Sequence, residues 1–192
     1  MTNIVKEKLE KSIECKKKLL QNEENIEKIT KVCNEIVNCY KNENKIYVCG
    51  NGGSAADAQH FAAELVGRYL MNREALPAIA FTTDSSILTA VGNDFGYEEI
   101  FKRQVEAFVK EGDIFVGIST SGNSKNIELA MVEARKRKAK VVGLLGRDGG
   151  KCKELCDYPI VVEYDRTPNI QECHITIIHI ICEIVEKELY EK

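Results

Sequence analysis

The sequence predicts an α/β fold, with a doubly wound parallel sheet of five strands and helices on both faces in a flavodoxin-type layering. Short apolar runs alternate with longer helical stretches, as is typical of parallel strands joined by crossover helices. The chain has 192 residues, of which 44% are hydrophobic, and no linker rich in proline or glycine divides it. We therefore expect a single domain over residues 1–192. Its expected strands lie at about 45–50, 78–82, 113–118, 140–145 and 158–162.

The first 44 residues have a different pattern. An apolar stripe at helical spacing predicts one or two amphipathic helices before the first strand. The stripe consists of Ile26, Ile29, Cys33, Ile36 and Tyr40. The apolar face of this N-terminal arm needs a partner, which a neighbouring subunit would supply. The segment 45–192 then forms the α/β core and the last helix.

A glycine-rich turn follows the first predicted strand and leads into an alanine-rich helix. Its small side chains let backbone N–H groups and one hydroxyl approach a polar ligand at the positive end of that helix. His60 and Glu64, spaced i and i+4, project from one face of the helix one to two turns further on. An ordinary strand-turn-helix with a solvated His–Glu pair would have the same sequence pattern, so this motif alone does not establish a ligand site. The turn consists of Asn51, Gly52, Gly53 and Ser54.

A second polar loop, Ser119–Ser124, follows the third predicted strand and precedes a helical stretch at 125–138. Hydroxyls and free N–H groups at a helix N-terminus suit a phosphate monoester. An N-capping serine is the simpler interpretation, but a cap needs one hydroxyl and this loop has four. Neither loop has the spacing of a P-loop or of a dinucleotide-binding turn. Because both loops follow strands, we expect them at the carboxyl edge of the sheet, binding a small phosphorylated metabolite.

The three histidines are the next candidates for chemistry. Histidine is the usual general acid or base near neutral pH and the commonest metal ligand. His174 and His179 lie in the last helical stretch, which also contains Gln171. For His179, which has isoleucines on both sides, the alternative is a buried core histidine with satisfied hydrogen bonds.

Five motifs occur in a fixed order within residues 45–190. They are Cys-Gly-Asn-Gly-Gly-Ser-Ala-Ala-Asp-Ala-Gln-His-Phe-Ala-Ala-Glu-Leu, Leu-Pro-Ala-Ile-Ala, Gly-Asn-Asp-Phe-Gly, Gly-Ile-Ser-Thr-Ser-Gly-Asn-Ser and Ile-Gln-Glu-Cys-His. With these motifs the chain resembles the sugar isomerase (SIS) family, specifically its phosphoheptose isomerases. The resemblance implies an aldose–ketose isomerase that interconverts sedoheptulose 7-phosphate and D-glycero-D-manno-heptose 7-phosphate. In that family this is the first step of ADP-heptose synthesis for surface glycans.

The resemblance also implies site residues, one zinc ion per subunit, and a homotetramer with active sites at subunit interfaces. The implied catalytic pair is Glu64 and His179. The implied zinc ligands are His60, Glu64, Gln171 and His179. The implied phosphate-binding residues are Ser119, Thr120, Ser121 and Ser124. The implied sugar contacts are Asn51, Gly52, Gly53, Asn93 and Asp94, and we add Ser54, Glu64, Arg68 and Gln171 as candidate substrate-binding residues.

The chemistry gives these residue types a reason. Moving a carbonyl between C2 and C1 needs a base, a stabiliser for the enediolate and an acid, which a carboxylate, a metal and an imidazole supply. A zinc-bound carboxylate is a weaker base than a free one, so Glu64 either alternates between two roles or acts beside a metal that mainly organises the site. Gln171 and His179 are eight residues apart, about 12 Å along a regular helix and roughly 80° around it. They share a metal only if their side chains lean together, if the helix start is irregular, or if another subunit supplies one of them.

The chain departs from the family pattern at Asn169, where an arginine commonly precedes Ile-Gln-Glu. Arg166 would have to replace that arginine, which leaves the preferred sugar open. Arg68, in the sequence Gly-Arg-Tyr, is expected either to neutralise substrate charge or to form an ion pair with Glu64 on the helix surface.

Composition excludes several other classes. The net charge of −3 gives no general attraction to nucleic acid, and the basic run at 135–138 is best interpreted as a solvated helix end. The N-terminus is too charged for a signal peptide, and the apolar C-terminal stretch is too short and interrupted to span a bilayer. We therefore expect a cytoplasmic protein with no membrane or nucleic-acid partner. The eight cysteines contain no Cys-x-x-Cys, which favours free buried thiols over disulfides or a metal cluster.

Two alternatives to this isomerase remain. One is a non-catalytic SIS relative, either a regulator that binds sugar phosphates or a protein that binds a replication initiator. Such a binding module has no need for both Glu64 and His179, so their presence favours the enzyme. The other is an isomerase of a different sugar phosphate, because nothing in the two loops measures the length of the substrate.

Overall fold

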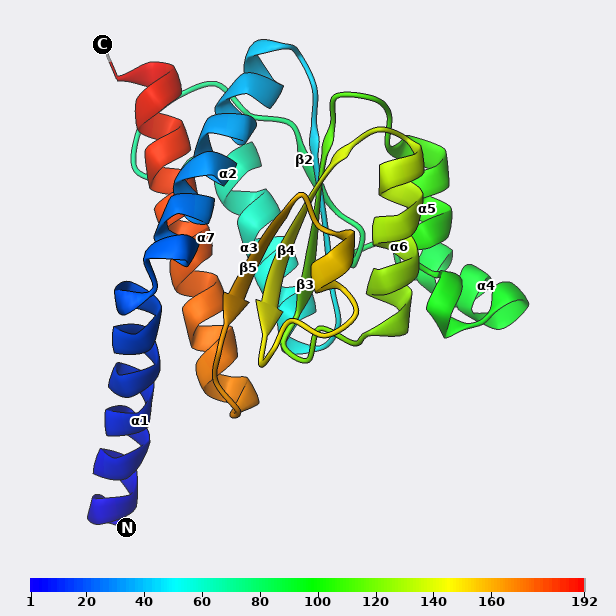
Figure 1. Ribbon diagram of the computed structural model, residues 1–192. Coiled ribbons are helices and arrows are strands. Elements are labelled where there is room, and N and C mark those ends of the chain that lie inside the picture. The colour runs from blue at the N-terminus through cyan, green and yellow to red at the C-terminus, as the bar shows by residue number, and fades with distance from the viewer. Residues whose placement is uncertain (192) are drawn as a thin grey trace.

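A parallel sheet of five strands, in the order β2-β1-β3-β4-β5, lies at the centre of the computed structural model, which describes residues 1–191 (Figure 1). The doubly wound sheet predicted from the sequence is therefore confirmed, and every strand end lies within two residues of its predicted position. The strands are β1 (Ile46–Gly50), β2 (Ala78–Ala80), β3 (Ile114–Ser119), β4 (Lys140–Gly146) and β5 (Tyr158–Val162).

Helices cover both faces of the sheet because successive strand residues point to opposite sides. Val48 contributes to a core shared with α2, α3 and α7, whereas Tyr47 and Cys49 contribute to a separate core with α5 and α6. In Figure 1 these two helix layers lie on either side of the strands, with α4 at the outer edge of the second layer. The helices are α1 (Thr2–Gln21), α2 (Glu23–Lys41), α3 (Gly53–Val66), α4 (Ser85–Phe95), α5 (Lys102–Phe108), α6 (Lys125–Lys136) and α7 (Thr167–Tyr190), with short 3-10 turns at η1 (Tyr97–Glu99) and η2 (Lys153–Leu155).

The N-terminal arm consists of two helices. They separate at Asn22, whose side chain accepts a hydrogen bond of 3.0 Å from the Asn25 N–H and so caps α2. Helix α2 packs against α7 and β5, but α1 extends beyond the body of the molecule (Figure 1). Helix α1 carries the exposed apolar residues Ile4, Val5, Leu9, Ile13 and Leu20. The amphipathic arm is confirmed, but Ile29, Cys33 and Ile36 of the predicted stripe are buried within this chain and need no neighbouring subunit. A subunit that covers α1 stays a prediction.

The eight cysteines are all free thiols, and seven of them are buried. Burial raises the pKa of thiols such as Cys33, to about 12, so these side chains act as small apolar groups. None of the helices within residues 1–191 is both long enough and apolar enough to cross a bilayer.

Candidate metal and substrate site

Helices α3 and α7 pack side by side on one face of the sheet and bring three candidate residues together. The Nε2 atoms of His60 and His179 are 3.0 Å apart, and His60 Nε2 is 3.1 Å from Glu64 Oε1. The three ligand atoms of His60, Glu64 and His179 all lie within 4.8 Å of one another. His179 is 115 residues or more from the other two in the sequence, yet the three side chains converge on one point; we call this group the His–Glu–His cluster.

The His–Glu–His cluster fits a divalent metal ion. Two imidazole nitrogens and a carboxylate oxygen are a ligand set of catalytic zinc sites, which keep a further position open for water or substrate. Nitrogens bound to tetrahedral zinc at about 2.0–2.1 Å lie roughly 3.3 Å apart, close to the observed 3.0 Å. The His60 side chain is 45% exposed, so the cluster is also open to a ligand.

Gln171 lies at a different level of the same helix pair. Its amide nitrogen is packed against Gly53, where an added Cβ would come within 2.3 Å of it. The amide also acts on Asp57, since burial raises the pKa of that carboxyl group and a hydrogen bond from Gln171 opposes the rise. Gln171 thus meets α3 between about one and two turns before His60. That Gln171 binds the same metal as His179 stays a prediction.

The two histidines of α7 have different environments. His174 is fully buried, and its Nε2 lies 3.0 Å from the carbonyl oxygen of Leu145. Burial lowers the pKa of His174 to about 4, although the hydrogen bond to Leu145 acts in the opposite direction. His174 is therefore the neutral core histidine, and the alternative of a core role for His179, which is only half-buried at the cluster, is wrong.

The serine loop gathers its hydroxyls at the carboxyl end of β3. The Oγ atoms of Ser119 and Ser124 are 2.9 Å apart, and Ser119 Oγ accepts a hydrogen bond of 3.1 Å from the Gly122 N–H. Ser124 occupies the N-cap position of α6, but its hydroxyl pairs with Ser119 rather than with a helix N–H group. Ser124 therefore has the position of an N-cap, as expected, but not the hydrogen bond of one. The N–H groups and hydroxyls of the serine loop, at this helix end, suit a phosphate.

Two residues that sequence reasoning missed hold Asn51. Tyr97 donates its hydroxyl to Asn51 Oδ1 at 2.9 Å, and the amides of Asn51 and Asn126 exchange two hydrogen bonds of 2.9 Å. Asn51 Oδ1 therefore has two donors already, and the amide keeps one N–H for a ligand. Tyr97 directly follows Gly-Asn-Asp-Phe-Gly, which is the only sequence signal for it, and Asn126 had none.

The remaining candidates are more dispersed. Asn93 and Asp94 are exposed at the end of α4 and bond to each other, with 2.8 Å between Asn93 Nδ2 and Asp94 Oδ1. Helix α3 ends at Val66, so Arg68 lies beyond the helix rather than on its surface. The carboxylate of Glu64 pairs with His60, and the expected ion pair with Arg68 does not occur among the described residues.

A profile of known families that is described as "SIS domain" matches residues 11–146. The chain belongs to the SIS family. A phosphoheptose isomerase from Clostridium acetobutylicum is 50% identical over 190 residues, 99% of this chain and 97% of that protein. A phosphoheptose isomerase from Sulfurimonas denitrificans is 52% identical over the same length and the same shares. The solved phosphoheptose isomerase from Neisseria gonorrhoeae superposes with a TM-score of 0.92 at 42% identity, covering 97% of this chain and 98% of that one.

The SIS fold therefore carries an isomerase in this chain, of the phosphoheptose isomerase group. The two candidate regions lie at different positions along α3 of this SIS domain. The helix begins at Gly53, two residues after Asn51, whose amide bonds to Asn126 two residues beyond the serine loop, whereas His60 and Glu64 come seven and eleven residues after Gly53. At 1.5 Å per residue these positions are about 10 and 16 Å along the helix axis. Within one SIS chain, the cluster and the serine loop are thus separated by a large part of α3.

Proposed function

We propose that this chain interconverts sedoheptulose 7-phosphate and D-glycero-D-manno-heptose 7-phosphate at a zinc site formed by His60, Glu64 and His179. The observation that supports the proposal most strongly is the convergence of these three side chains from α3 and α7 in a member of the phosphoheptose isomerase group. Gln171 is the fourth proposed ligand. The alternative, a different sugar phosphate as substrate, is distinguished from this proposal by an activity assay.

The reaction transfers one proton between carbons and one between oxygens. From the ketose, a base takes the proton on C1 to give an enediolate, and the proton returns to C2. A second group moves a proton from the O1 hydroxyl to O2, which leaves the carbonyl at C1. Glu64 and His179 are the proposed pair, with the carboxylate suited to the carbon-bound proton and the imidazole to the oxygens. A bound zinc ion would supply Lewis-acid polarisation of the carbonyl.

Substrate binding is assigned to the carboxyl edge of the sheet. Ser119, Thr120, Ser121 and Ser124 hold the phosphate, while the free N–H of the Asn51 amide donates to a sugar hydroxyl. Because the serine loop and the cluster are separated along α3, we propose that a neighbouring subunit contributes part of each site. A homotetramer with active sites at subunit contacts satisfies this and covers the exposed apolar residues of α1. The proposed setting is the cytoplasm, at the first step toward surface-glycan heptose.

The deciding experiment incubates the purified protein with sedoheptulose 7-phosphate, with and without a chelator, and follows formation of the aldoheptose phosphate. Glu64→Gln and His179→Ala are each expected to lower kcat by at least about 10²-fold, the usual contribution of positioned acid–base catalysis. Glu188→Gln, an exposed carboxylate on the same helix as His179, is the matched control and should keep wild-type turnover. Near-normal turnover in both site variants would contradict the assigned pair.

A further inference from the structure

The imidazole of His179 contacts two aromatic rings. The ring of Tyr69 is stacked on it, with centroids 5.9 Å apart and an interplanar angle of 30°. The ring of His60 meets it edge-on, with centroids 5.1 Å apart and an angle of 60°. Both separations lie in the range at which aromatic pairs attract each other. Tyr69 belongs to the loop that follows α3.

The orientation of a metal-binding histidine depends on what its ring contacts. Such residues generally donate their second ring N–H to a carboxylate, a carbonyl or water, which fixes the ring orientation. Within residues 1–191 the His179 ring forms its hydrogen bond through Nε2, with His60. The ring of His60 meets the edge of this imidazole, whereas the ring of Tyr69 stacks on its face and so restrains its plane.

The loop that carries Tyr69 is itself held rigidly by a buried carboxylate. Glu186 of α7 accepts backbone hydrogen bonds from Tyr69 at 3.0 Å, from Leu70 at 2.7 Å and from Met71 at 2.6 Å. It also accepts one of 2.8 Å from Arg73 Nε, and both side chains of this ion pair are 2% exposed. Burial raises the pKa of Glu186, but these four hydrogen bonds outweigh it and keep the pKa below its ordinary value.

Arg73 links the same loop to the residue that carries the carboxylate of the cluster. Its Nη2 donates to the carbonyl oxygen of Glu64 at 2.8 Å, and its Nη1 donates to that of Leu65 at 2.9 Å. These two carbonyls belong to the last turn of α3, where they have no partner within the helix. One buried ion pair thus fixes the backbone of Glu64 and the position of Tyr69 against His179.

We infer that Tyr69 is a positioning residue, whose ring, held by the Arg73–Glu186 pair, orients His179 for metal binding. The inference rests on the metal site of the proposed function and adds a residue that touches neither metal nor substrate. Removing the ring frees the imidazole to rotate about its side-chain torsions, so ordering it on the metal then costs entropy. The hydroxyl of Tyr69 plays no part, which makes phenylalanine a conservative replacement.

The test compares Tyr69→Leu with Tyr69→Phe in the full chain after removal of metal. Zinc affinity is measured by competition with a chromogenic chelator, and the visible spectrum is recorded with Co²⁺ in place of zinc. Tyr69→Leu should weaken zinc binding by about tenfold, the lower range for loss of a residue that supports a metal ligand, and change the Co²⁺ spectrum. Tyr69→Phe should match the wild type in both. Thermal unfolding of the metal-free proteins checks that each is folded, with Tyr69→Gln as a second ring-less variant.

The inference is overturned if Tyr69→Leu and Tyr69→Gln bind zinc as tightly as wild type with unchanged Co²⁺ spectra, or if Tyr69→Phe loses as much affinity as they do. It is also overturned if the wild-type protein binds neither metal. These measurements use no substrate, so their result is separate from the isomerase assay. Zinc binding that depends on the Tyr69 ring, in a protein that fails to convert sedoheptulose 7-phosphate, would leave this inference standing and remove the proposed substrate.

Discussion

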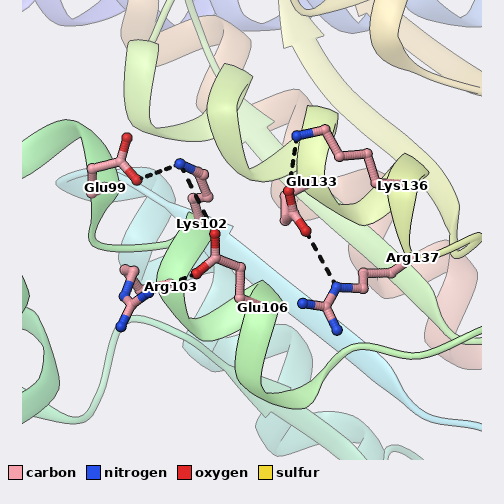
Figure 2. A network of polar contacts seen from close by, with 7 residues as sticks. All are labelled: Glu99, Lys102, Arg103, Glu106, Glu133, Lys136 and Arg137. Atoms are coloured by element: carbon pink, nitrogen blue, oxygen red, sulfur yellow. Dashed lines mark hydrogen bonds and ion pairs between the residues drawn. The ribbon is translucent and has the colours of Figure 1, made fainter.

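Two buried carboxylates, on opposite faces of the sheet, are held in different ways. Glu186, on the face with α3 and α7, accepts hydrogen bonds from three backbone N–H groups and from Arg73, and the side chains of the Glu186–Arg73 pair are 2% exposed. Glu133, on α6 of the other face, pairs with Lys136 and Arg137, whose side chains are 63% and 41% exposed (Figure 2). Both carboxylates lie within salt bridges, yet only the first organises a loop.

The two carboxylates also differ in whether their ion pairs affect the candidate site. The partners of Glu133 lie three and four residues away on its own helix end, so the contacts are local and screened by solvent. The partners of Glu186 are more than 110 residues away and join α7 to the loop after α3. Because that loop places Tyr69 beside His179, the geometry of the cluster depends on a charge pair that water does not reach.

The largest expected effect is the loss of stability on substitution of Glu186, compared with the same substitution of Glu133. Glu186→Gln leaves Arg73 as a buried charge without a partner and should lower the free energy of unfolding by about 3–5 kcal/mol. Glu133→Gln loses contacts with exposed cations and should cost about 1 kcal/mol or less. Urea unfolding of both variants and the wild type at pH 7 measures the two differences.

Equal losses of stability in these two variants would show that burial of the ion pair is not what distinguishes the two faces. Zinc affinity provides a second comparison in the same proteins. Glu133→Gln should bind zinc as the wild type does, whereas Glu186→Gln should bind it more weakly because the Tyr69 loop has lost its anchor. If a folded Glu186→Gln protein binds zinc with wild-type affinity, the position of the Tyr69 loop does not affect the metal site.

The next effect, in order of size, comes from the neutral histidine of the same face. His174 has a pKa of about 4 in the folded chain, against an ordinary value of 6.5. Between these values the unfolded chain binds a proton that the folded chain does not, so stability is complete above about pH 6.5 and falls as the pH is lowered toward 4. The full loss is about 3 kcal/mol at 1.36 kcal/mol per pKa unit.

His174→Gln isolates this contribution, since glutamine has an N–H that can donate to the Leu145 carbonyl but does not titrate. The free energy of unfolding, measured by urea at pH 7 and at pH 5, should fall less in the variant than in the wild type. A variant whose stability falls as steeply as that of the wild type would show that other groups cause the acid sensitivity of this face.

Much of the fold and part of the site could be predicted from the sequence because those features depend on local patterns. Alternating apolar runs located the strands, and the i, i+4 spacing of His60 and Glu64 placed both on one helix face. The convergence of His179 with this pair came from resemblance to a family, since no spacing rule relates residues 115 positions apart. The environments of His174 and His179 could not be distinguished, because both lie among apolar neighbours in the sequence.

The contacts that sequence reasoning missed are all long-range. Glu186 is one of several glutamates in the last helix, and only the fold shows that it alone meets the backbone of the Tyr69 loop. Arg68 is the candidate partner of Glu64 in the sequence because the two are four residues apart, but helix α3 stops at Val66 and the chain turns Arg73 back onto the last carbonyls of the helix. The position of a helix end therefore decided which arginine contacts the residue that carries the carboxylate.

The smallest expected effect concerns how closely helices approach the second face. Gly117 of β3 lies under α6, where an added Cβ would come within 2.4 Å of Met131 Cε and 2.9 Å of Ile127 Cγ2. Gly117→Ala should therefore destabilise the chain by about 1–3 kcal/mol, the usual cost of overpacking a core. Gly92→Ala, inside α4 with its nearest neighbour at 3.7 Å, should instead stabilise by about 0.5–1 kcal/mol, because alanine favours a helix more than glycine does.

Thermal unfolding of these two variants tests the sign of each change in stability. Zinc binding tests whether the change also affects the opposite face of the sheet. Gly117 faces the core of α5 and α6, on the side of the sheet away from the His–Glu–His cluster. A Gly117→Ala protein that is less stable but binds zinc with wild-type affinity would show that strain on one face does not reach the other. Weakened zinc binding in this variant would mean that the sheet transmits the displacement of α6 to α3 and α7. The packing of the two faces would then be coupled.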